Sequence, residues 1–246
     1  MRIAILEDDR DQARLIQSWL QEEGHHVDIF HSGKDILHAL RSESFDLLIL
    51  DWLMPDMDGF EVLKWARQYY DWRVPIIFAT RLDSEEDIVK ALDAGADDYI
   101  EKPLRRRVLT ARINALTRRL DQSLLRNTDI LDFSPYRIDL VSRIIYLHDQ
   151  PLELTQKEYD LSVFLFRNSS RALSRGHILD SVWGTTPDLN TRTVDTHISR
   201  LRKKLALNKE NGWLLTSIYQ HGYRLDPSRS TRKAAAVENN VSAQFG

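Results

Sequence analysis

The chain has 246 residues, of which 42% are hydrophobic and 29% are charged, so it can bury enough apolar surface for two ordinary domains. Cysteine is absent, which excludes disulfide scaffolds, cysteine-based metal sites and thiol catalysis. No apolar run approaches the roughly 18 residues of a membrane span, and the acidic N-terminus does not match a secretory signal. We therefore expect a cytoplasmic protein.

The net charge of -3 is the sum of two halves with opposite sign. Residues 1–119 carry 17 Lys and Arg against 23 Asp and Glu, whereas the rest of the chain carries 17 against 14. An acidic half suits a cation site, and a basic half suits a polyanion such as nucleic acid. The charge distribution therefore predicts two domains with different tasks.

Short apolar segments alternate with helical patterns in the first half. We predict strands at 2–6, 27–30, 47–50, 76–79 and 98–100, and a last helix at 105–119. Apolar strands separated by helices are typical of a parallel sheet that is covered on both faces. The sequence thus predicts an α/β domain over residues 1–119, with a doubly wound five-stranded parallel sheet. A polar linker is expected at 120–129.

The second half contains shorter elements. We predict strands at 136–140 and 143–147, a turn at 149–151, helices that begin at Thr155, Ser174 and Thr191, and a hairpin of 213–218 and 223–225. This order predicts a small α+β domain at 130–226. Residues 227–246 are polar and have almost no apolar anchor, so we expect a disordered tail.

Three acidic residues follow the ends of two predicted strands. Glu7 and Asp8 follow the first strand and Asp51 follows the third, so the carboxyl edge of the sheet should bring them together. Oxygen-rich sites of this kind suit Mg²⁺. Thr80 ends the fourth strand and Lys102 follows the fifth, and an aspartyl phosphate needs a hydroxyl, an ammonium and a metal around it. The pattern predicts that Asp51 accepts a phosphoryl group.

Simpler explanations exist for single residues of this kind. A lone aspartate at a strand end is usually a helix cap or a turn residue. Asp56 does not begin a calcium loop, because Glu61 occupies the position that requires glycine. His25 and His26 lack a further histidine at ligand spacing. Only the combination of these residues at the strand ends predicts an aspartyl-phosphate site.

Four segments of the first half are specific in combination. They are ILEDD at 5–9, LLILDWLMPDMDGFEVL at 47–63, IIFAT at 76–80 and AGADDYIEKPL at 94–104. In this order and spacing they resemble the receiver domain of two-component response regulators. The resemblance implies that Asp51 is the phosphoacceptor and that Mg²⁺ is held by Glu7, Asp8, Asp51 and the backbone carbonyl of Leu53.

The same resemblance implies roles for residues on the last two strands. Lys102 contacts the phosphate and precedes a cis peptide bond to Pro103. Thr80 and Tyr99 form the switch pair, in which the hydroxyl moves onto the phosphate and the ring rotates inward. Arg81 stands where the family usually has a small residue, so we expect it to screen the phosphate partly.

Residues 191–209 contain a predicted helix that runs from 191 to about 207 and has two different faces. The segment contains six Lys or Arg against one Asp, and an apolar stripe runs through Val194, Ile198, Leu201 and Leu205. Such a helix can pack on a core while its basic face reaches DNA phosphates and base edges. A solvated surface helix and an amphipathic helix at a membrane surface are the alternatives.

The second half, from about 130 to 225, contains LTQKEYDL, ALSRGHILDSVWG, RTVDTHISRLRKKL and HGYRL. These motifs resemble the winged helix-turn-helix effector domain of the OmpR/PhoB family. The resemblance implies a recognition helix at 191–205 and a loop at 183–190 that touches RNA polymerase. The residues expected at the DNA are Arg192, His197, Ser199, Arg200, Arg202 and Lys203, with Tyr219 and His221 in the wing. Tyr219 stands where the family usually has Arg, so we expect a weak wing contact.

Both halves together predict a regulator of transcription and not an enzyme. A sensor histidine kinase would phosphorylate Asp51, and the chain would then dimerise and bind promoter DNA. The family's dimer face uses the fourth helix, fifth strand and fifth helix of the receiver, where Asp98 and Arg112 match a cross-dimer ion pair, whereas Ile88 and Val108 replace a charged pair. Two alternatives are a DNA-binding regulator whose receiver dimerises without phosphorylation and a Mg²⁺-dependent phosphohydrolase with an aspartyl-phosphate intermediate.

Overall fold

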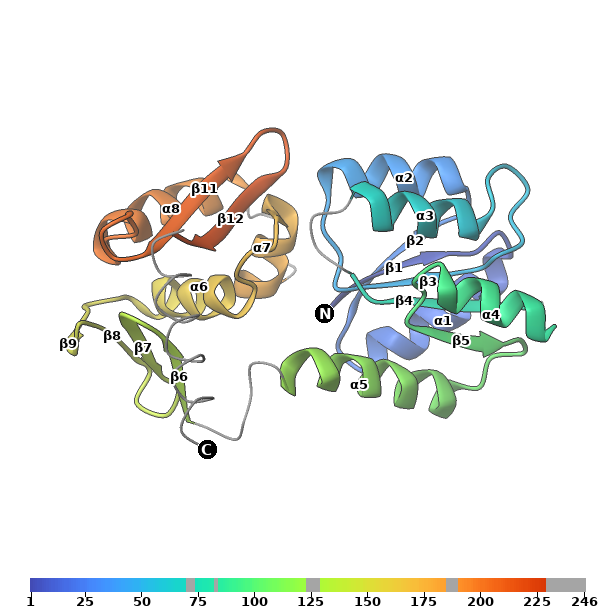
Figure 1. The fold of residues 1–246 in the computed structure, drawn as a ribbon, viewed down its shortest axis with the longest axis horizontal. Helices are drawn as coiled ribbons and strands as arrows, with labels where there is room; N and C mark the ends of the chain where they lie inside the picture. The colour runs from blue at the N-terminus through green and yellow to red at the C-terminus, as the bar shows by residue number, and fades with distance from the viewer. Residues whose placement is uncertain (70–73, 82–83, 123–128, 185–189, 229–246) are drawn as a thin grey trace, which may run out of the picture. The chain divides into compact units, whose positions relative to one another are not determined.

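A computed structural model describes residues 1–69, 74–81, 84–122, 129–184 and 190–228, and the chain divides into two compact units, Met1–Ser123 and Leu124–Gly246 (Figure 1). Most of the predicted linker and nearly all of the predicted tail lie outside the described residues. No helix in the described part of the chain is long and apolar enough to cross a membrane. Each unit has a hydrophobic core of its own.

The first unit alternates strands and helices along the chain. Its elements are β1 (Arg2–Leu6), α1 (Arg10–Glu22), β2 (His26–Phe30), α2 (Gly33–Ser42), β3 (Leu47–Leu50), α3 (Gly59–Tyr69), β4 (Ile76–Thr80), α4 (Glu85–Asp93), β5 (Asp98–Glu101) and α5 (Arg106–Gln122). The five strands are parallel in the order β2-β1-β3-β4-β5. This confirms the predicted doubly wound α/β fold, and α5 continues three residues beyond the predicted end at residue 119.

Side-chain alternation along the strands builds a core on each face of this sheet. In β1, Ala4 and Leu6 join the core under α2, α3 and α4, whereas Ile3 and Ile5 join the core under α1 and α5. All four residues of β3 are buried, because this central strand is covered on both faces. Figure 1 shows α2 and α3 on one side of the sheet and α5 on the other.

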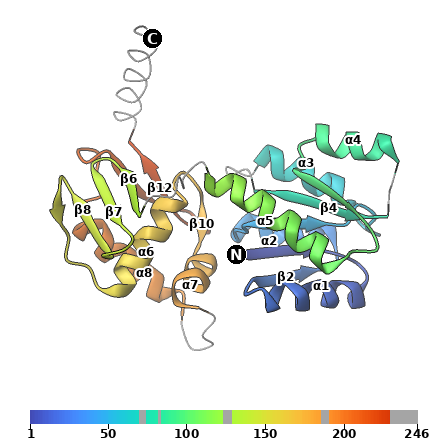
Figure 2. The same cartoon turned by 90° about the horizontal axis from the view of Figure 1, so that it is seen from below.

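In its described residues, the second unit contains two small antiparallel sheets and three helices. Its elements are β6 (Ile130–Phe133), β7 (Tyr136–Asp139), β8 (Ile144–Leu147), β9 (Gln150–Pro151), α6 (Gln156–Arg167), β10 (Leu173–Ser174), α7 (Arg175–Trp183), α8 (Arg192–Lys204), β11 (Trp213–Ile218) and β12 (Gly222–Pro227). The strands pair in the orders β6-β7-β8-β9 and β10-β12-β11. Figure 2 shows α6 beside the four-stranded sheet. The unit is the predicted α+β winged-helix domain.

Several boundaries in the second unit differ from the prediction. The helix expected to run to residue 207 ends at Lys204, because Ala206 adopts a left-handed conformation with φ 48°. The expected start of the tail at 227 is wrong, since Pro227 pairs with Trp213 in the last strand. The short strands β6, β9 and β10 were not predicted. Two of them have only two residues, too few for an alternating pattern.

The caps of the helices explain where they begin. Thr155 and Glu158 form a reciprocal capping box at the start of α6, where the sequence predicts that a helix begins. Ser174 caps α7 through the amide of His177. The C-terminal end of α8 is held by a side chain from β7: the buried phenol of Tyr136 donates a hydrogen bond of 2.7 Å to the carbonyl of Leu205. Burial raises the pKa of Tyr136 to about 12.

Candidate functional sites

The carboxylates of Glu7, Asp8 and Asp51 converge at the carboxyl edge of the five-stranded sheet. Each contributes an oxygen, and these oxygens lie within 4.8 Å of one another. They meet because β1 and β3 are hydrogen-bonded neighbours, with Leu6 opposite Leu50. Glu7 and Asp51 are buried, whereas Asp8 is exposed. Solvent therefore reaches the cluster on the side of Asp8, the only exposed residue of the three.

Lys102 ties the end of β5 to two of these carboxylates. Its Nζ lies 2.7 Å from Glu7 Oε2 and 2.5 Å from Asp51 Oδ2, and its side chain is only 4% exposed. Burial raises the pKa of Glu7, while the Lys102 ammonium opposes this shift. The Lys102–Pro103 peptide bond is cis, as the resemblance implies. Asp51 also accepts a hydrogen bond of 3.2 Å through Oδ1 from the Leu53 amide.

The charge and donor set of this pocket fit Mg²⁺. Three carboxylates face one ammonium, so the cluster retains excess negative charge. Glu7 Oε1 is buried and has no hydrogen-bond partner among the described residues. A hard divalent cation satisfies such an oxygen and offsets repulsion between the carboxylates. Glu7, Asp8 and Asp51 are the side chains that would hold it.

The remaining predicted pocket residues lie on β4, β5 and the loop after β4. Thr80 is fully buried at the end of β4, and its carbonyl accepts a hydrogen bond of 2.9 Å from the Lys102 amide. Tyr99 is half-buried on β5, opposite Phe78. Arg81 is exposed immediately after Thr80. The fold therefore brings Thr80 beside Lys102 and places Tyr99 one strand further from Asp51.

Sequence reasoning missed the role of Asp56, which it weighed only as a calcium ligand. Its carboxylate accepts hydrogen bonds from the amides of Gly33 and Lys34 and from the hydroxyl of Ser32, at the start of α2. Although burial opposes the shift, these bonds lower the pKa of Asp56 to about 2. Asp56 thus fastens the loop that follows Asp51 to a neighbouring helix.

Helix α8 has the predicted apolar and basic faces. Val194, Ile198 and Leu201 are buried in the core of the second unit. The exposed predicted residues are Arg192, Ser199, Arg200 and Lys203. Their shared exposure leaves them accessible to a ligand.

Two residues predicted to face DNA have contacts within the fold. Arg202 donates through Nε to the carbonyl of Leu215 at 2.9 Å and through a terminal nitrogen to Ser217 Oγ at 3.1 Å. The His197 ring is half-buried, with its centroid 5.0 Å from that of Trp183. Arg202 therefore fastens α8 to β11, which its position in a basic run did not reveal.

A further network between the helices and the wing was not predicted. Asp195 on α8 accepts hydrogen bonds from Arg175 Nε at 2.9 Å and from the Tyr223 hydroxyl at 2.6 Å. The guanidinium carbon atoms of Arg175 and Arg202 lie 5.0 and 5.6 Å from the centroid of the Tyr223 ring. Although burial opposes the shift, the two hydrogen bonds lower the pKa of Asp195. This network fixes the hairpin relative to α8.

The wing is the β11–β12 hairpin with its connecting residues 219–221. Tyr219 is 87% exposed, and Gln220 adopts a left-handed conformation with φ 55°. His221 is half-buried. A Cβ at Gly222 would lie 2.0 Å from the carbonyl oxygen of Leu173, so this position admits only glycine. Of the predicted polymerase-contacting loop at 183–190, residues 185–189 lie outside the described part.

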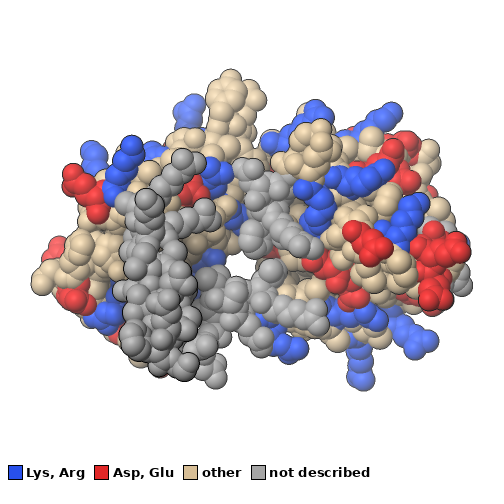
Figure 3. All heavy atoms as spheres, viewed as in Figure 1, with Lys and Arg blue, Asp and Glu red and all other residues tan. Residues whose placement is uncertain are grey.

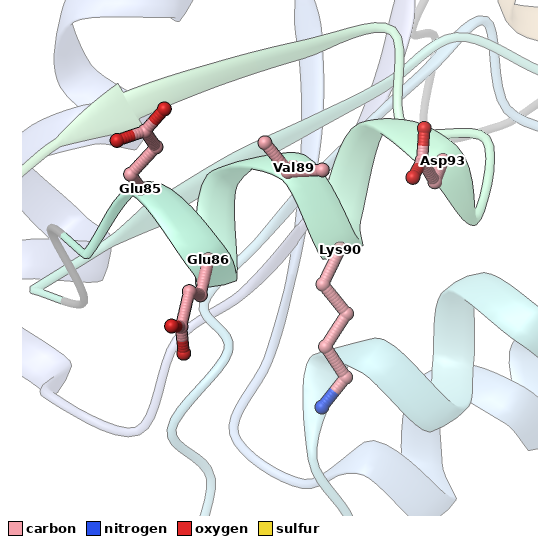
Figure 4. Close-up of a pocket in the computed structure, with 5 residues that line it drawn as sticks. All are labelled: Glu85, Glu86, Val89, Lys90 and Asp93. Atoms are coloured by element: carbon pink, nitrogen blue, oxygen red, sulfur yellow. The ribbon is translucent and has the colours of Figure 1, made fainter.

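The α4, β5 and α5 surface of the first unit combines acidic and apolar side chains. Acidic side chains gather at the end of the unit that carries α4 (Figure 3). A surface pocket on α4 is lined by Glu85, Glu86, Val89, Lys90 and Asp93 (Figure 4). Asp98 and Arg112, which the resemblance implies to pair across a dimer, form a 2.7 Å ion pair within the chain.

Both halves of the sequence match described families. Residues 3–114 match the family described as "Response regulator receiver domain", and residues 149–225 match "Transcriptional regulatory protein, C terminal". "Sensory transduction protein RegX3" of Mycolicibacterium smegmatis is 35% identical over 226 residues, which span 91% of this chain and 98% of that protein. "Response regulator ArlR" of Staphylococcus haemolyticus is 38% identical over 203 residues, which span 82% and 90%.

Solved structures are also similar along most of the chain. The response regulator DrrB of Thermotoga maritima, described as an OmpR/PhoB homolog, has 28% sequence identity and a TM-score of 0.44. The similarity covers 92% of this chain and 98% of that one.

Proposed function

This chain belongs to the OmpR/PhoB family of two-component response regulators, and from that membership we propose that phosphorylation of Asp51 controls its binding to promoter DNA. The receiver implies a cognate histidine kinase, and the second domain implies DNA as a ligand. We assign residues 1–119 to phosphorylation and residues 130–226 to DNA binding. Because the proposed ligand is promoter DNA, we propose that the protein acts in the cytoplasm.

The observation that carries the proposal is the buried contact between Asp51 and Lys102. In the transfer step, an Asp51 carboxylate oxygen attacks the phosphorus atom, the new oxygen–phosphorus bond forms, and the bond to the kinase histidine breaks. Lys102, which already lies 2.5 Å from Asp51 Oδ2, offsets charge on the phosphoryl oxygens. The Leu53 amide orients the other carboxylate oxygen. When bound, Mg²⁺ would supply further charge neutralisation there.

The residues at the end of β4 and on β5 are proposed to transmit the change. Thr80 is adjacent to Lys102 through a backbone hydrogen bond, so its hydroxyl is suited to contact the added phosphate. Tyr99 lies on β5, the strand that Lys102 follows, and is half-buried, and we propose that its ring changes position when the phosphate is added. Arg81 is exposed beside Thr80, and we propose that it slows access of water to the phosphate.

Phosphorylation is proposed to favour a homodimer through the α4, β5 and α5 surface. Val89 and Leu92 on α4 are 49% and 44% exposed, and Val108 on α5 is 39% exposed. Apolar side chains at this surface gain from burial in a dimer. The Asp98–Arg112 ion pair must open within each chain before these residues can pair across the dimer.

DNA binding is assigned to the exposed basic face of α8 and, with less affinity, to the wing. Arg192, Arg200 and Lys203 are exposed and positively charged, which suits contacts with phosphates and base edges. Ser199 lies on the same exposed side, and His197 and His221 are half-buried contributors at its edges. The loop at 183–190 is proposed to contact RNA polymerase.

Labelling with a small phosphoryl donor tests the proposal. Full-length protein incubated with acetyl phosphate and Mg²⁺ should gain the mass of one phosphate, and Asp51→Ala should gain none. Asp58→Asn serves as a matched control from the same loop, because Asp58 caps α3 instead of joining the cluster. Equal labelling of Asp51→Ala would contradict the assignment. Selection of genomic fragments with and without donor then tests whether phosphorylation increases DNA binding.

A further inference from the structure

The residue that follows the proposed phosphoacceptor belongs to a tightly packed aromatic cluster. Trp52 is 6% exposed, and its ring stacks on Phe60 with a centroid distance of 5.0 Å and an interplanar angle of 6°. The Gly59 amide donates to the Trp52 carbonyl at 3.0 Å, and a Cβ at Gly59 would lie 2.1 Å from the Asp51 carbonyl oxygen. The Trp52 ring therefore belongs to a segment whose backbone is closely packed beside Asp51.

Helix α4 has few contacts of its own with the receiver core. Ala91 is its one buried residue, while Val89 and Leu92 point to solvent. Lys90 points away from Val89 and toward α3 (Figure 4). Its Nζ lies 5.4 Å from the centroid of the Trp52 ring and 4.9 Å from that of Phe60. One ammonium thus links α4 to both stacked rings.

We propose that Lys90 is a positioning residue that holds α4 against the Asp51 loop through cation–aromatic contacts with Trp52 and Phe60. The coupling of α4 to phosphorylation rests on the proposed function of Asp51. A shift of α4 must break both contacts, so they favour the α4 position of the unphosphorylated chain. At a partly exposed site, cation–aromatic contacts change such an equilibrium by roughly two- to fivefold.

Amide hydrogen exchange of residues 85–93 in the full-length, unphosphorylated chain tests the contact. Lys90→Met keeps the length of the side chain but removes the charge, and it should speed exchange of α4 by roughly two- to fivefold. Lys90→Arg retains a cation and should exchange like the wild type. Lys64→Met is the matched control, because the Lys64 ammonium lies 5.0 Å from the Phe60 centroid but extends from α3. It should leave α4 unchanged.

A second measurement tests the coupling. Acetyl phosphate and Mg²⁺ should change α4 exchange in the wild type and in Lys90→Arg, and this change should shrink in Lys90→Met. The proposal would be overturned if, without donor, the α4 amides of Lys90→Met exchanged at the wild-type rate. It would also be overturned if Lys64→Met accelerated α4 exchange as much as Lys90→Met does. The donor-free measurement does not depend on Asp51. If Lys90→Met speeds α4 exchange without donor while Asp51→Ala is labelled like the wild type, the Lys90 contact stands and the proposed function fails.

Discussion

The receiver pocket and the DNA-binding surface differ in how the fold fixes their charged side chains. In the pocket, Lys102 is buried and bonded to two carboxylates, so its position is determined by the chain itself. On α8, Arg200 and Lys203 are exposed, whereas Arg202 is bonded to β11. A charged residue in a functional surface is therefore expected to affect stability only where the fold already supplies its partner.

The largest effect is expected from Lys102→Met. The substitution leaves Glu7 and Asp51 without their buried cation, so the free energy of unfolding at pH 7 should fall by about 3 kcal/mol. Removing the ammonium raises the pKa of Glu7 further, so the folded variant binds protons more readily and regains stability as the pH falls. Urea denaturation across pH, with and without Mg²⁺, measures this. Mg²⁺ should restore part of the loss, and a loss unaffected by both pH and Mg²⁺ would contradict the charge argument.

A smaller effect should separate two arginines on one helix. Arg200→Ala should weaken DNA binding by about 1 kcal/mol and lower the salt slope by about one, with unfolding unchanged within about 0.5 kcal/mol. Arg202→Ala should also lower the free energy of unfolding by about 1 to 2 kcal/mol, because the Leu215 carbonyl loses its donor. Dissociation constants on one promoter fragment compare the DNA affinities of the two variants, and urea denaturation compares their free energies of unfolding. Equal stability of the two variants would show that the Arg202 contact contributes little.

Asp56→Asn should have a smaller effect that depends on pH. The pKa of Asp56 is lowered in the folded state to about 2, so its ionised form stabilises the fold above the unfolded pKa of about 4, and this contribution disappears as the pH falls through about 2. Because Asp56 is exposed, solvent screening limits the effect to below about 1 kcal/mol. Thermal unfolding between pH 2 and 6 should show a flatter pH profile for the variant, and identical profiles would rule out this contribution.

The smallest effect is expected in the wing. Tyr219 is almost fully exposed and carries no charge, so Tyr219→Ala should weaken DNA binding less than Arg200→Ala. Tyr219→Arg should tighten binding by about twofold at low salt, because a guanidinium gains from the negative potential of a narrow minor groove. Dissociation constants at two salt concentrations measure both changes. A larger loss from Tyr219→Ala than from Arg200→Ala would show that the tyrosine itself holds DNA.

The sequence predicted the receiver pocket better than the DNA-binding surface for a physical reason. Strand ends are determined by runs of buried apolar residues, and parallel pairing then brings Glu7, Asp51 and Lys102 to one edge. Partners of long surface side chains depend on packing between elements distant in the sequence. Arg202 and Asp195 therefore looked like members of a helix face, although both are bonded within the fold.

The phenol of Tyr136 makes the end of α8 depend on a strand that lies far away in the sequence. Tyr136 precedes the carbonyl that it binds by 69 positions, so the sheet and the end of α8 must both exist before this bond can form. Contacts between such distant positions form late, because the intervening chain must first be ordered. Until β7 and α8 have both formed, the carbonyl of Leu205 therefore lacks this donor. The end of α8 is thus fixed by a contact from a strand that lies far earlier in the chain.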